Sequence, residues 1–232
     1  LLVLLLRRQR NLDRRHKKMQ KTLIIVPMKQ LSDAKSRLKR NIEDKLRVIV
    51  AKKLLDQTLS RITMAIEKSR ETHKLSVLTE CDEVRSFVEK KDISVITSSI
   101  KNKLSESLFF GVQWAKSNGF SSACIIPADL GNPSNEELKK FIFFPLESNN
   151  MIICPSRDLG TNALLISPPD GITFYYGKDS FQKHLEIANR NKIKTTVLKL
   201  KSLTFDIDVM EDLQELLIEF PDFLGDGDVY HE

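Results

Sequence analysis

The feature that most constrains the fold of this chain is a repeated alternation between short apolar runs and longer amphipathic segments after residue 21. The first four runs of strand length lie at 22–27, 74–79, 93–97 and 123–130, and segments with helical periodicity follow them. Such alternation is typical of β–α–β units, whose strands pair in parallel. We therefore predict an α/β fold with a mostly parallel sheet and helices on both faces.

The remaining elements complete one domain. Further strands are expected near 151–155, 163–167 and 195–200, and helices over 42–68, 81–90, 104–119, 134–143, 180–191 and 210–219. Asn41 is placed to cap the first of these helices, and Gly119 is placed to close the third. Because no internal repeat or low-complexity linker interrupts residues 22–220, we assign them to one domain, followed by a C-terminal tail over 221–232.

The positive charge of the chain is concentrated at its N-terminus. The formal net charge is +6, yet residues 1–21 hold eight Lys or Arg and one acidic residue, a net +7 that leaves −1 for the rest. A nearly neutral body argues against a nucleic-acid-binding domain. The apolar run 1–6 is too short to span a membrane. It also precedes the basic residues, whereas the apolar stretch of a secretory signal follows its basic residues. We interpret residues 1–21 as a disordered or non-native basic tail; a tail that binds nucleic acid or a membrane surface is the alternative.

The cysteines and histidines limit the kinds of site. Cys81, Cys124 and Cys154 lie far apart without a CxxC motif, and the four histidines are scattered. Disulfide frameworks and zinc clusters have characteristic cysteine and histidine spacings that this pattern lacks. The pattern favours reduced thiols in a cytoplasmic protein.

A basic loop follows the first predicted strand. The segment VPMKQLSDAKSRL, residues 26–38, contains Lys29, Lys35 and Arg37. Ligands of parallel α/β sheets bind at the carboxyl ends of the strands, and cationic side chains there bind polyphosphate. A solvated basic loop is the alternative, and the glycines of a P-loop are absent.

Aspartates follow two other predicted strands. Asp129 directly follows the strand in IIPADLGNP, and Asp206 and Asp208 in FDIDVMEDL have the spacing that places both on one face of an extended chain. Two carboxylates about 4 Å apart repel by roughly 4 kcal/mol at an effective dielectric of about 20. Mg²⁺, which binds one or two carboxylates plus phosphate oxygens, would remove this repulsion. A helix N-cap is the alternative for each aspartate.

A charged turn precedes the strand near 163–167. In CPSRDLGTNALLISPP, residues Arg157, Asp158, Gly160, Thr161 and Asn162 stand directly before the apolar run. A hairpin turn needs only the glycine and the asparagine. The additional polar side chains indicate a turn that holds a ligand.

A helix start farther along the chain offers a second set of donors. In YYGKDSFQKHL, Gly177 exposes a backbone amide and Ser180 stands where a helix begins. A helix N-terminus binds phosphate or carboxylate groups. Plain capping is the alternative for Ser180, and His184, one turn into the helix, is expected to be structural.

Together these segments resemble a known family. VPMKQLSDAKSRL, PADLGNPSNEEL, PSRDLGTNALLISPPDGITFYYGKDSFQKHL and FDIDVMEDL are similar to the 2-phospho-L-lactate guanylyltransferase family of coenzyme F-420 biosynthesis, which includes phosphoenolpyruvate guanylyltransferases. The resemblance runs from about residue 22 to 218. Its most specific part is the RDxGTNALL turn with the later SFxxHL. The resemblance implies a single Rossmann-like, glycosyltransferase-A-type nucleotidyltransferase domain.

The resemblance also implies a reaction and a set of site residues. The GMP moiety of GTP would be joined to 2-phospho-L-lactate or phosphoenolpyruvate, with Mg²⁺ as cofactor and pyrophosphate as the second product. The metal ligands would be Asp129 and Asp208. The phosphorylated three-carbon acid would be bound by Thr161, Gly177 and Ser180. GTP would be bound by Lys29, Lys35, Arg37 and Ser105, of which Lys35 and Arg37 would also be catalytic.

The chain departs from the family pattern at two positions, and other functions stay open. The family usually has proline after PADL, where this chain has Gly131, and its guanine-side helix often begins LNxAL, where this chain has LSESL with Ser105. The alternatives are a nucleotidyltransferase for another acceptor, such as 3-phosphoglycerate, a sugar phosphate or the molybdenum cofactor, and a non-catalytic GTP-binding module. The expected partners are small molecules rather than nucleic acid or membrane, and a homodimer is compatible with the sequence.

Overall fold

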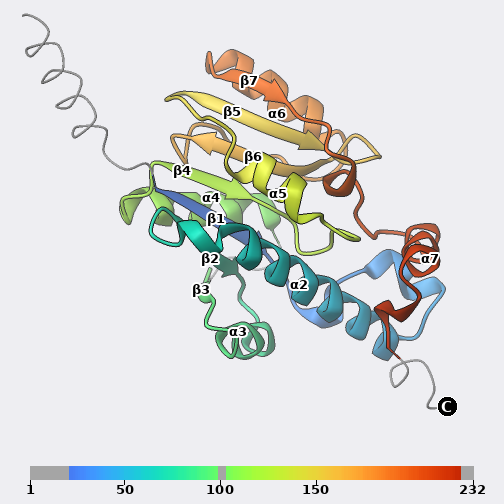
Figure 1. Ribbon diagram of the computed structural model, residues 1–232. Coiled ribbons are helices and arrows are strands. Elements are labelled where there is room, and N and C mark those ends of the chain that lie inside the picture. Colours follow the sequence, from blue (N-terminus) through green and yellow to red (C-terminus); the bar gives the residue numbers. More distant parts are fainter. Residues whose placement is uncertain (1–20, 99–102, 226–232) are drawn as a thin grey trace, which may run out of the picture.

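The computed structural model describes residues 21–98 and 103–225, which build one seven-stranded sheet (Figure 1). The strand order is β3-β2-β1-β4-β6-β5-β7, and only β6 runs antiparallel to its neighbours. The prediction of a mostly parallel sheet is confirmed. The strands are β1 (Thr22–Pro27), β2 (His73–Leu78), β3 (Ser94–Ile96), β4 (Ser122–Ile125), β5 (Asn150–Pro155), β6 (Thr161–Ser167) and β7 (Lys194–Val197).

The α-helices begin and end within two residues of their predicted bounds. They are α2 (Asp44–Ile66), α3 (Asp82–Glu89), α4 (Leu104–Ser117), α5 (Asn135–Ile142), α6 (Ser180–Arg190) and α7 (Met210–Glu219). Gly119, with a φ of 80°, follows α4 as predicted. The prediction that Asn41 caps the first helix is wrong, because the N-cap of α2 is Glu43, which makes no capping side-chain bond.

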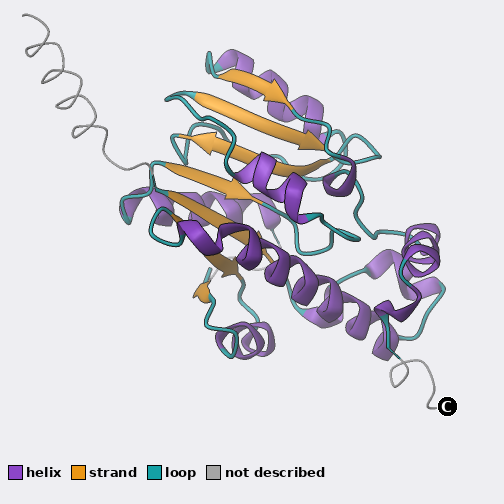
Figure 2. Cartoon of the chain, in the orientation of Figure 1, coloured by secondary structure: helices purple, strands orange, loops and turns teal. Residues whose placement is uncertain are grey.

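Both faces of the sheet are covered by helices (Figure 2). Successive side chains on a strand point to opposite faces. In β1, Ile24 and Val26 join a buried cluster with α2, α3 and α5, whereas Leu23 and Ile25 join a second cluster with α4 and α6. Burial on both faces explains why central strands such as β1 are continuous apolar runs rather than alternating ones.

A third buried cluster joins segments that are far apart in the sequence. It includes Leu38 from the loop after β1, Leu54 from α2, Ile207, and Leu213 from α7. Figure 1 shows α7 beside the loop that precedes α2, a loop that contains two short 3₁₀ helices. Burying each such leucine or isoleucine contributes about 1.5–3 kcal/mol. The cluster therefore holds the basic loop against the segment that carries Asp206 and Asp208.

A short antiparallel pairing places the chain after β4 beside the chain before α7. The backbone N–H of Ile207 donates to the carbonyl of Asp129 at 3.0 Å, and that of Gly131 donates to the carbonyl of Phe205 at 2.9 Å. A Cβ atom at Gly131 would approach the Phe205 ring to 2.6 Å. Proline has no N–H to donate. This pairing therefore gives a physical reason for glycine where the resembled family usually has proline.

The predicted tails lie largely outside the described residues. Residues 1–20 of the basic tail and 226–232 of the C-terminal tail are not described. Leu224 is buried in the third cluster, and Nζ of Lys53 donates to its carbonyl at 2.7 Å. Within the two described ranges, every helix is too short or too polar to cross a bilayer.

Candidate functional site

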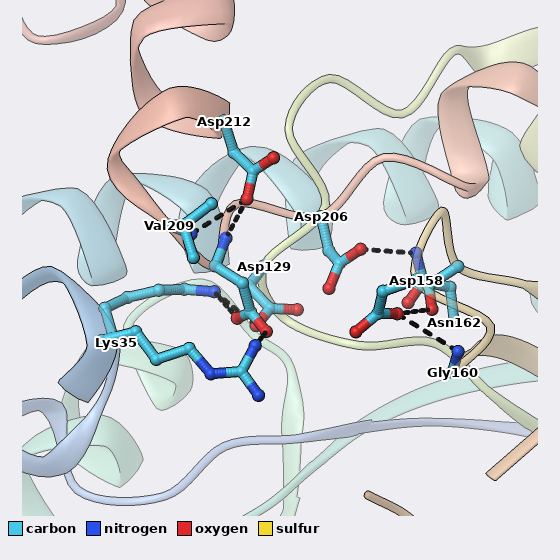
Figure 3. A network of polar contacts seen from close by, with 11 residues as sticks. Lys35, Asp129, Asp158, Gly160, Asn162, Asp206, Val209 and Asp212 are labelled. Atoms are coloured by element: carbon cyan, nitrogen blue, oxygen red, sulfur yellow. Dashed lines mark hydrogen bonds and ion pairs between the residues drawn. The ribbon is translucent and has the colours of Figure 1, made fainter. Parts of the chain in front are cut away.

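A buried lysine lies between two carboxylates beyond the carboxyl ends of β1 and β4 (Figure 3). Nζ of Lys35 donates to Oδ2 of Asp129 at 2.5 Å and to Oδ1 of Asp208 at 3.4 Å. Nη1 of Arg37 donates to Oδ2 of Asp208 at 3.0 Å. The side chain of Lys35 is 5% exposed, whereas those of Asp129 and Asp208 are 33% and 39% exposed. The basic loop and the two carboxylates predicted to bind metal thus meet in one cluster.

This cluster lines a cleft of about 770 Å³. The walls of the cleft come from the loops after β1, β2 and β4 and from the N-terminus of α4. Ligands of α/β sheets bind at this edge, and small-molecule pockets have volumes of roughly 300–1,000 Å³. Five of the sequence-predicted site residues line the cleft, namely Lys29, Lys35, Arg37, Asp129 and Asp208.

The backbone at Lys35 is held in an unfavourable conformation. Its φ of 54° and ψ of 39° lie in the left-handed region, which costs a residue other than glycine roughly 1–2 kcal/mol. Arg47, only 2% exposed, donates to the carbonyl of the preceding Ala34 and to Oδ1 of Asp44. Sequence reasoning missed Arg47, because an arginine in an amphipathic helix is usually exposed. Its hydrogen bond therefore anchors the loop backbone directly before Lys35.

The three aspartates and Lys35 perturb one another electrostatically. Burial raises the pKa of Asp206 to about 6, the charges of Asp129 and Asp208 add to the increase, and a 3.1 Å hydrogen bond from Asn162 opposes it. Burial alone would lower the pKa of Lys35, but Asp129 and Asp208 outweigh it and raise that pKa. At neutral pH Lys35 is therefore a stable buried cation.

The alternative that Asp206 or Asp208 caps the N-terminus of α7 is wrong. The N-cap of α7 is Val209, and Oδ2 of Asp212 accepts the backbone N–H groups of Asp208 and Val209, each at 2.9 Å. The side chain of Asp208 faces the cleft instead, and that of Asp206 faces Asn162. Their carboxylates are therefore not used to start the helix.

The residues predicted to bind the phosphorylated acid form a second group, outside the lining of the 770 Å³ cleft. Thr161 begins β6 and Ser180 begins α6, while Gly177, with a φ of 111°, lies between these elements. Oγ1 of Thr161 lies 2.9 Å from Nδ1 of His184, and Oγ of Ser180 donates to Oγ1 of Thr161 at 3.3 Å. The N-cap of α6 is Asp179. The interpretation of Ser180 as a cap is therefore wrong, because its hydroxyl faces Thr161.

The charged turn between β5 and β6 is braced internally. The hydroxyl of Ser156 donates to Oδ1 of Asp158, which also accepts from the backbone N–H of Gly160 at 3.1 Å. Arg157 donates twice to Glu215, at 2.7 and 2.8 Å. The Ser156 bond lowers the pKa of Asp158, and the nearby charge of Arg37 adds to this shift. Asp158 therefore braces the turn from within, and Arg157 joins it to Glu215 of α7.

Asn162 connects this turn to the carboxylates. Its Nδ2 atom donates to the carbonyl of Leu203 at 2.9 Å and to Oδ1 of Asp206 at 3.1 Å. Figure 3 shows Asp206 between Asn162 on one side and Asp129 with Lys35 on the other. Sequence reasoning gave Asn162 no partner, because Asp206 lies 44 residues away. Asn162 and Asp206 thus join the two groups of predicted site residues.

Ser105 lies at the start of α4 and holds the segment that carries Gly177. Its Oγ atom accepts the backbone N–H of Tyr176 at 3.0 Å. Its neighbours Leu104 and Ser107 line the cleft, but Ser105 does not. The contact of Ser105 with a nucleotide base stays a prediction.

The carboxylates of Asp129 and Asp208 fit a divalent cation. One oxygen of each carboxylate points toward the Lys35 ammonium. The space between the two side chains therefore stabilises a positive charge. In the part of the chain that the structure describes, no group of three or more His, Cys, Asp or Glu is arranged to hold a metal. Two carboxylates suffice for Mg²⁺, which keeps several waters and uses phosphate oxygens as further ligands. The pair therefore suits a metal that binds together with a phosphorylated substrate.

The fold is shared with a nucleotidyltransferase of known structure. The structure of a nucleotidyl transferase from Methanothermobacter superposes with a TM-score of 0.61 and 15% identity, covering 88% of this chain and 98% of the other, which shows the fold. Residues 22–223 match the family described as "Guanylyl transferase CofC like". The chain belongs to this guanylyl transferase family, and the resemblance identified from its motifs is confirmed.

Three curated relatives carry three different substrate names. A 3-phospho-D-glycerate guanylyltransferase from Colwellia psychrerythraea is 31% identical, covering 85% of this chain and 92% of the relative. A phosphoenolpyruvate guanylyltransferase from Sphaerobacter thermophilus is 29% identical, covering 84% and 92%. A 2-phospho-L-lactate guanylyltransferase from Methanobrevibacter ruminantium is 28% identical, covering 86% of each.

Proposed function

We propose that this protein transfers the GMP moiety of GTP to a phosphorylated three-carbon acid. The observation that carries the proposal is the cluster of Lys35, Arg37, Asp129 and Asp208 in one cleft. Such a transfer brings two anions together. The cluster supplies positive charge and a metal position for the triphosphate, and the Thr161 group supplies uncharged donors for the acid.

The proposed reaction is a single displacement at phosphorus. An oxygen of the acceptor phosphate attacks the α-phosphorus of GTP, and a new P–O bond forms. The bond from the α-phosphorus to the oxygen that bridges to the β-phosphorus breaks, and pyrophosphate leaves with that electron pair. The nucleophile is already an anion, so no general base is required. Catalysis would rest on in-line positioning and on stabilisation of the charge that develops.

The chain's own residues would divide this work. Lys29, Lys35 and Arg37 would bind the triphosphate, and Ser105 would contribute on the nucleotide side. Arg37, whose side chain is 64% exposed, can exchange its surface ion pair with Asp208 for a phosphate contact at small cost. Asp129 and Asp208 would hold Mg²⁺, which when bound would neutralise triphosphate charge.

Thr161, Gly177 and Ser180 would bind the acceptor phosphate. We propose 2-phospho-L-lactate or phosphoenolpyruvate as the acceptor, which would place the protein in cytoplasmic coenzyme F-420 biosynthesis. The 3-phosphoglycerate name of one relative makes that acid the third compound to test. All three acids present a phosphate and a carboxylate on a three-carbon frame.

The test is product analysis with one acid at a time. The purified protein is incubated with GTP, Mg²⁺ and each acid, and pyrophosphate release and product mass are measured. We expect pyrophosphate and a guanosine diphosphate-linked acid with at least one of the three, and neither product with the Asp129→Asn variant. GTP binding without pyrophosphate release for all three acids would contradict the proposal and favour a non-catalytic GTP-binding module.

A further inference from the structure

His184 is fully buried, and both of its ring nitrogens have a partner. Nε2 accepts the backbone N–H of Tyr175 at 3.0 Å, and Nδ1 lies 2.9 Å from Oγ1 of Thr161. The rings of Phe174 and Tyr176 contact the imidazole edge-on, with centroid distances of 6.2 and 5.2 Å. The ring is therefore held in one orientation from several sides.

The partners of His184 determine which nitrogen carries the proton. A backbone N–H can only donate, so Nε2 must be the unprotonated nitrogen of the ring. Burial lowers the pKa of His184 to about 4, so the ring is neutral at pH 7. A neutral imidazole has one N–H, which must then lie on Nδ1. Nδ1–H therefore donates to Oγ1 of Thr161.

This bond fixes the direction of the Thr161 hydroxyl. A hydroxyl has one hydrogen and two lone pairs. Oγ1 of Thr161 accepts from His184 and, at 3.3 Å, from the hydroxyl of Ser180. Both lone pairs are occupied, so the hydroxyl hydrogen of Thr161 is left to donate to another group. A donor, not an acceptor, is what binds a phosphate oxygen.

We propose that His184 is a positioning residue for the acceptor site: it orients the Thr161 hydroxyl as a hydrogen-bond donor to the phosphate of the acid. This inference rests on the proposed function. It also concerns the segment before Gly177, because Tyr175 is bound by His184 while the next backbone N–H, that of Tyr176, is bound by Ser105. His184 and Ser105 therefore hold two consecutive residues before Gly177, whereas the bond from His184 to Thr161 is the one that orients the proposed phosphate donor.

Two amide substitutions separate the two bonds of the ring. His184→Asn places an amide near the position of Nδ1 and keeps a donor to Thr161, whereas His184→Gln places its amide near the position of Nε2 and keeps the acceptor for Tyr175. His184→Gln leaves the Thr161 hydroxyl free to turn away from the phosphate, so we expect it to raise the acceptor KM by up to about the ten- to a hundredfold that loss of one charge-assisted hydrogen bond would cause. His184→Asn should stay within about threefold of the wild type, and the GTP KM should not change in either variant.

Two further measurements keep this test independent of turnover. The ¹⁵N NMR signals of the His184 ring should show the Nδ1–H tautomer in the wild type, and an Nε2–H tautomer would overturn the inference. Titration with inorganic phosphate should give weaker binding for His184→Gln than for His184→Asn. Equal defects in both variants, in step with equal losses of stability, would show a packing role only. Absence of pyrophosphate release with every acid would refute the proposed function but not the hydrogen-bond direction.

Discussion

Replacing Lys35 with methionine tests whether its ammonium holds the carboxylate cluster together. The change keeps most of the apolar stem and removes a charge that lies 2.5 Å from Asp129 and 3.4 Å from Asp208. Removal of the ammonium has two opposite effects on stability. The variant is stabilised because it no longer buries a charged group, and it is destabilised because Asp129, Asp206 and Asp208 repel one another without a cation between them. The pKa of Lys35 is raised despite burial. The carboxylates therefore outweigh the desolvation, and we expect a net loss of stability.

The expected loss follows from the exposure of the partners. Breaking a fully buried ion pair costs about 3–5 kcal/mol. The carboxylates of Asp129 and Asp208 are 33% and 39% exposed, so water screens them and we expect about 1–3 kcal/mol. In a domain of this size each kcal/mol lowers Tm by about 2–4 °C, so the expected decrease in Tm is roughly 2–12 °C. Mg²⁺ should restore part of the loss, because a ligand that binds the folded state stabilises it.

The assay is thermal unfolding at pH 7, in a chelator and in increasing Mg²⁺. Lys140, exposed on α5, supplies the matched control variant Lys140→Met. We expect Lys35→Met to have the lowest Tm in the chelator and the largest gain with Mg²⁺, and the control to follow the wild type. A Lys35→Met variant as stable as the wild type in the chelator would refute the reasoning, and so would a Mg²⁺ response no larger than that of the wild type.

Four further predictions concern other residues of the fold and the site. Asp129→Asn and Asp208→Asn should each abolish nearly all pyrophosphate release while circular dichroism stays unchanged; normal turnover at saturating Mg²⁺ would remove that residue from the metal site. Thr161→Val should raise the acceptor KM about ten- to a hundredfold and leave the GTP KM unchanged, in steady-state kinetics. Gly131→Ala brings a methyl group to 2.6 Å from an aromatic ring and should lower the free energy of unfolding by about 1–3 kcal/mol, in urea unfolding. Burial lowers the pKa of His184 from 6.5 to about 4, so between these pH values the unfolded chain binds a proton that the folded chain does not. As pH falls from 6.5 toward 4, the wild type should therefore lose up to about 3 kcal/mol of stability, whereas His184→Asn should not lose this contribution. Urea unfolding at each pH measures the difference.

The elements of the fold could be predicted because the central strands β1, β4, β5 and β6 are buried on both faces. In β1 every residue from 22 to 26 is buried, so the strand is a continuous apolar run with clear ends. The helices α4 and α6 also began where their patterns start. The cap of α2 could not be predicted in the same way. Asn41 has a favourable side chain for capping, but its backbone N–H bonds to Leu38 within the preceding 3₁₀ helix, so a local competitor determined where α2 begins.

The site could be predicted only in part, because its contacts cross long stretches of sequence. Lys35 lies 94 residues from Asp129 and 173 from Asp208. Their types and their places after strands were visible, whereas their convergence depends on the third buried cluster and on the pairing of 129–131 with 205–207. Arg47 gave no signal at all, since its burial follows from the path of a loop rather than from the pattern of its own helix.

The direction of β6 explains why a charged turn before a strand belongs to the site. In a wholly parallel sheet, residues that precede a strand lie at the edge opposite the ligand. Strand β6 is antiparallel, and its start pairs with the ends of its neighbours: Leu164 with Ile125 of β4, and Thr161 with Pro155 of β5. The reversal brings Thr161 and Asn162 to the edge where Asp129 follows β4. One antiparallel strand thus places the proposed acceptor group beside the proposed nucleotide cleft, as the proposed transfer between two anionic substrates requires.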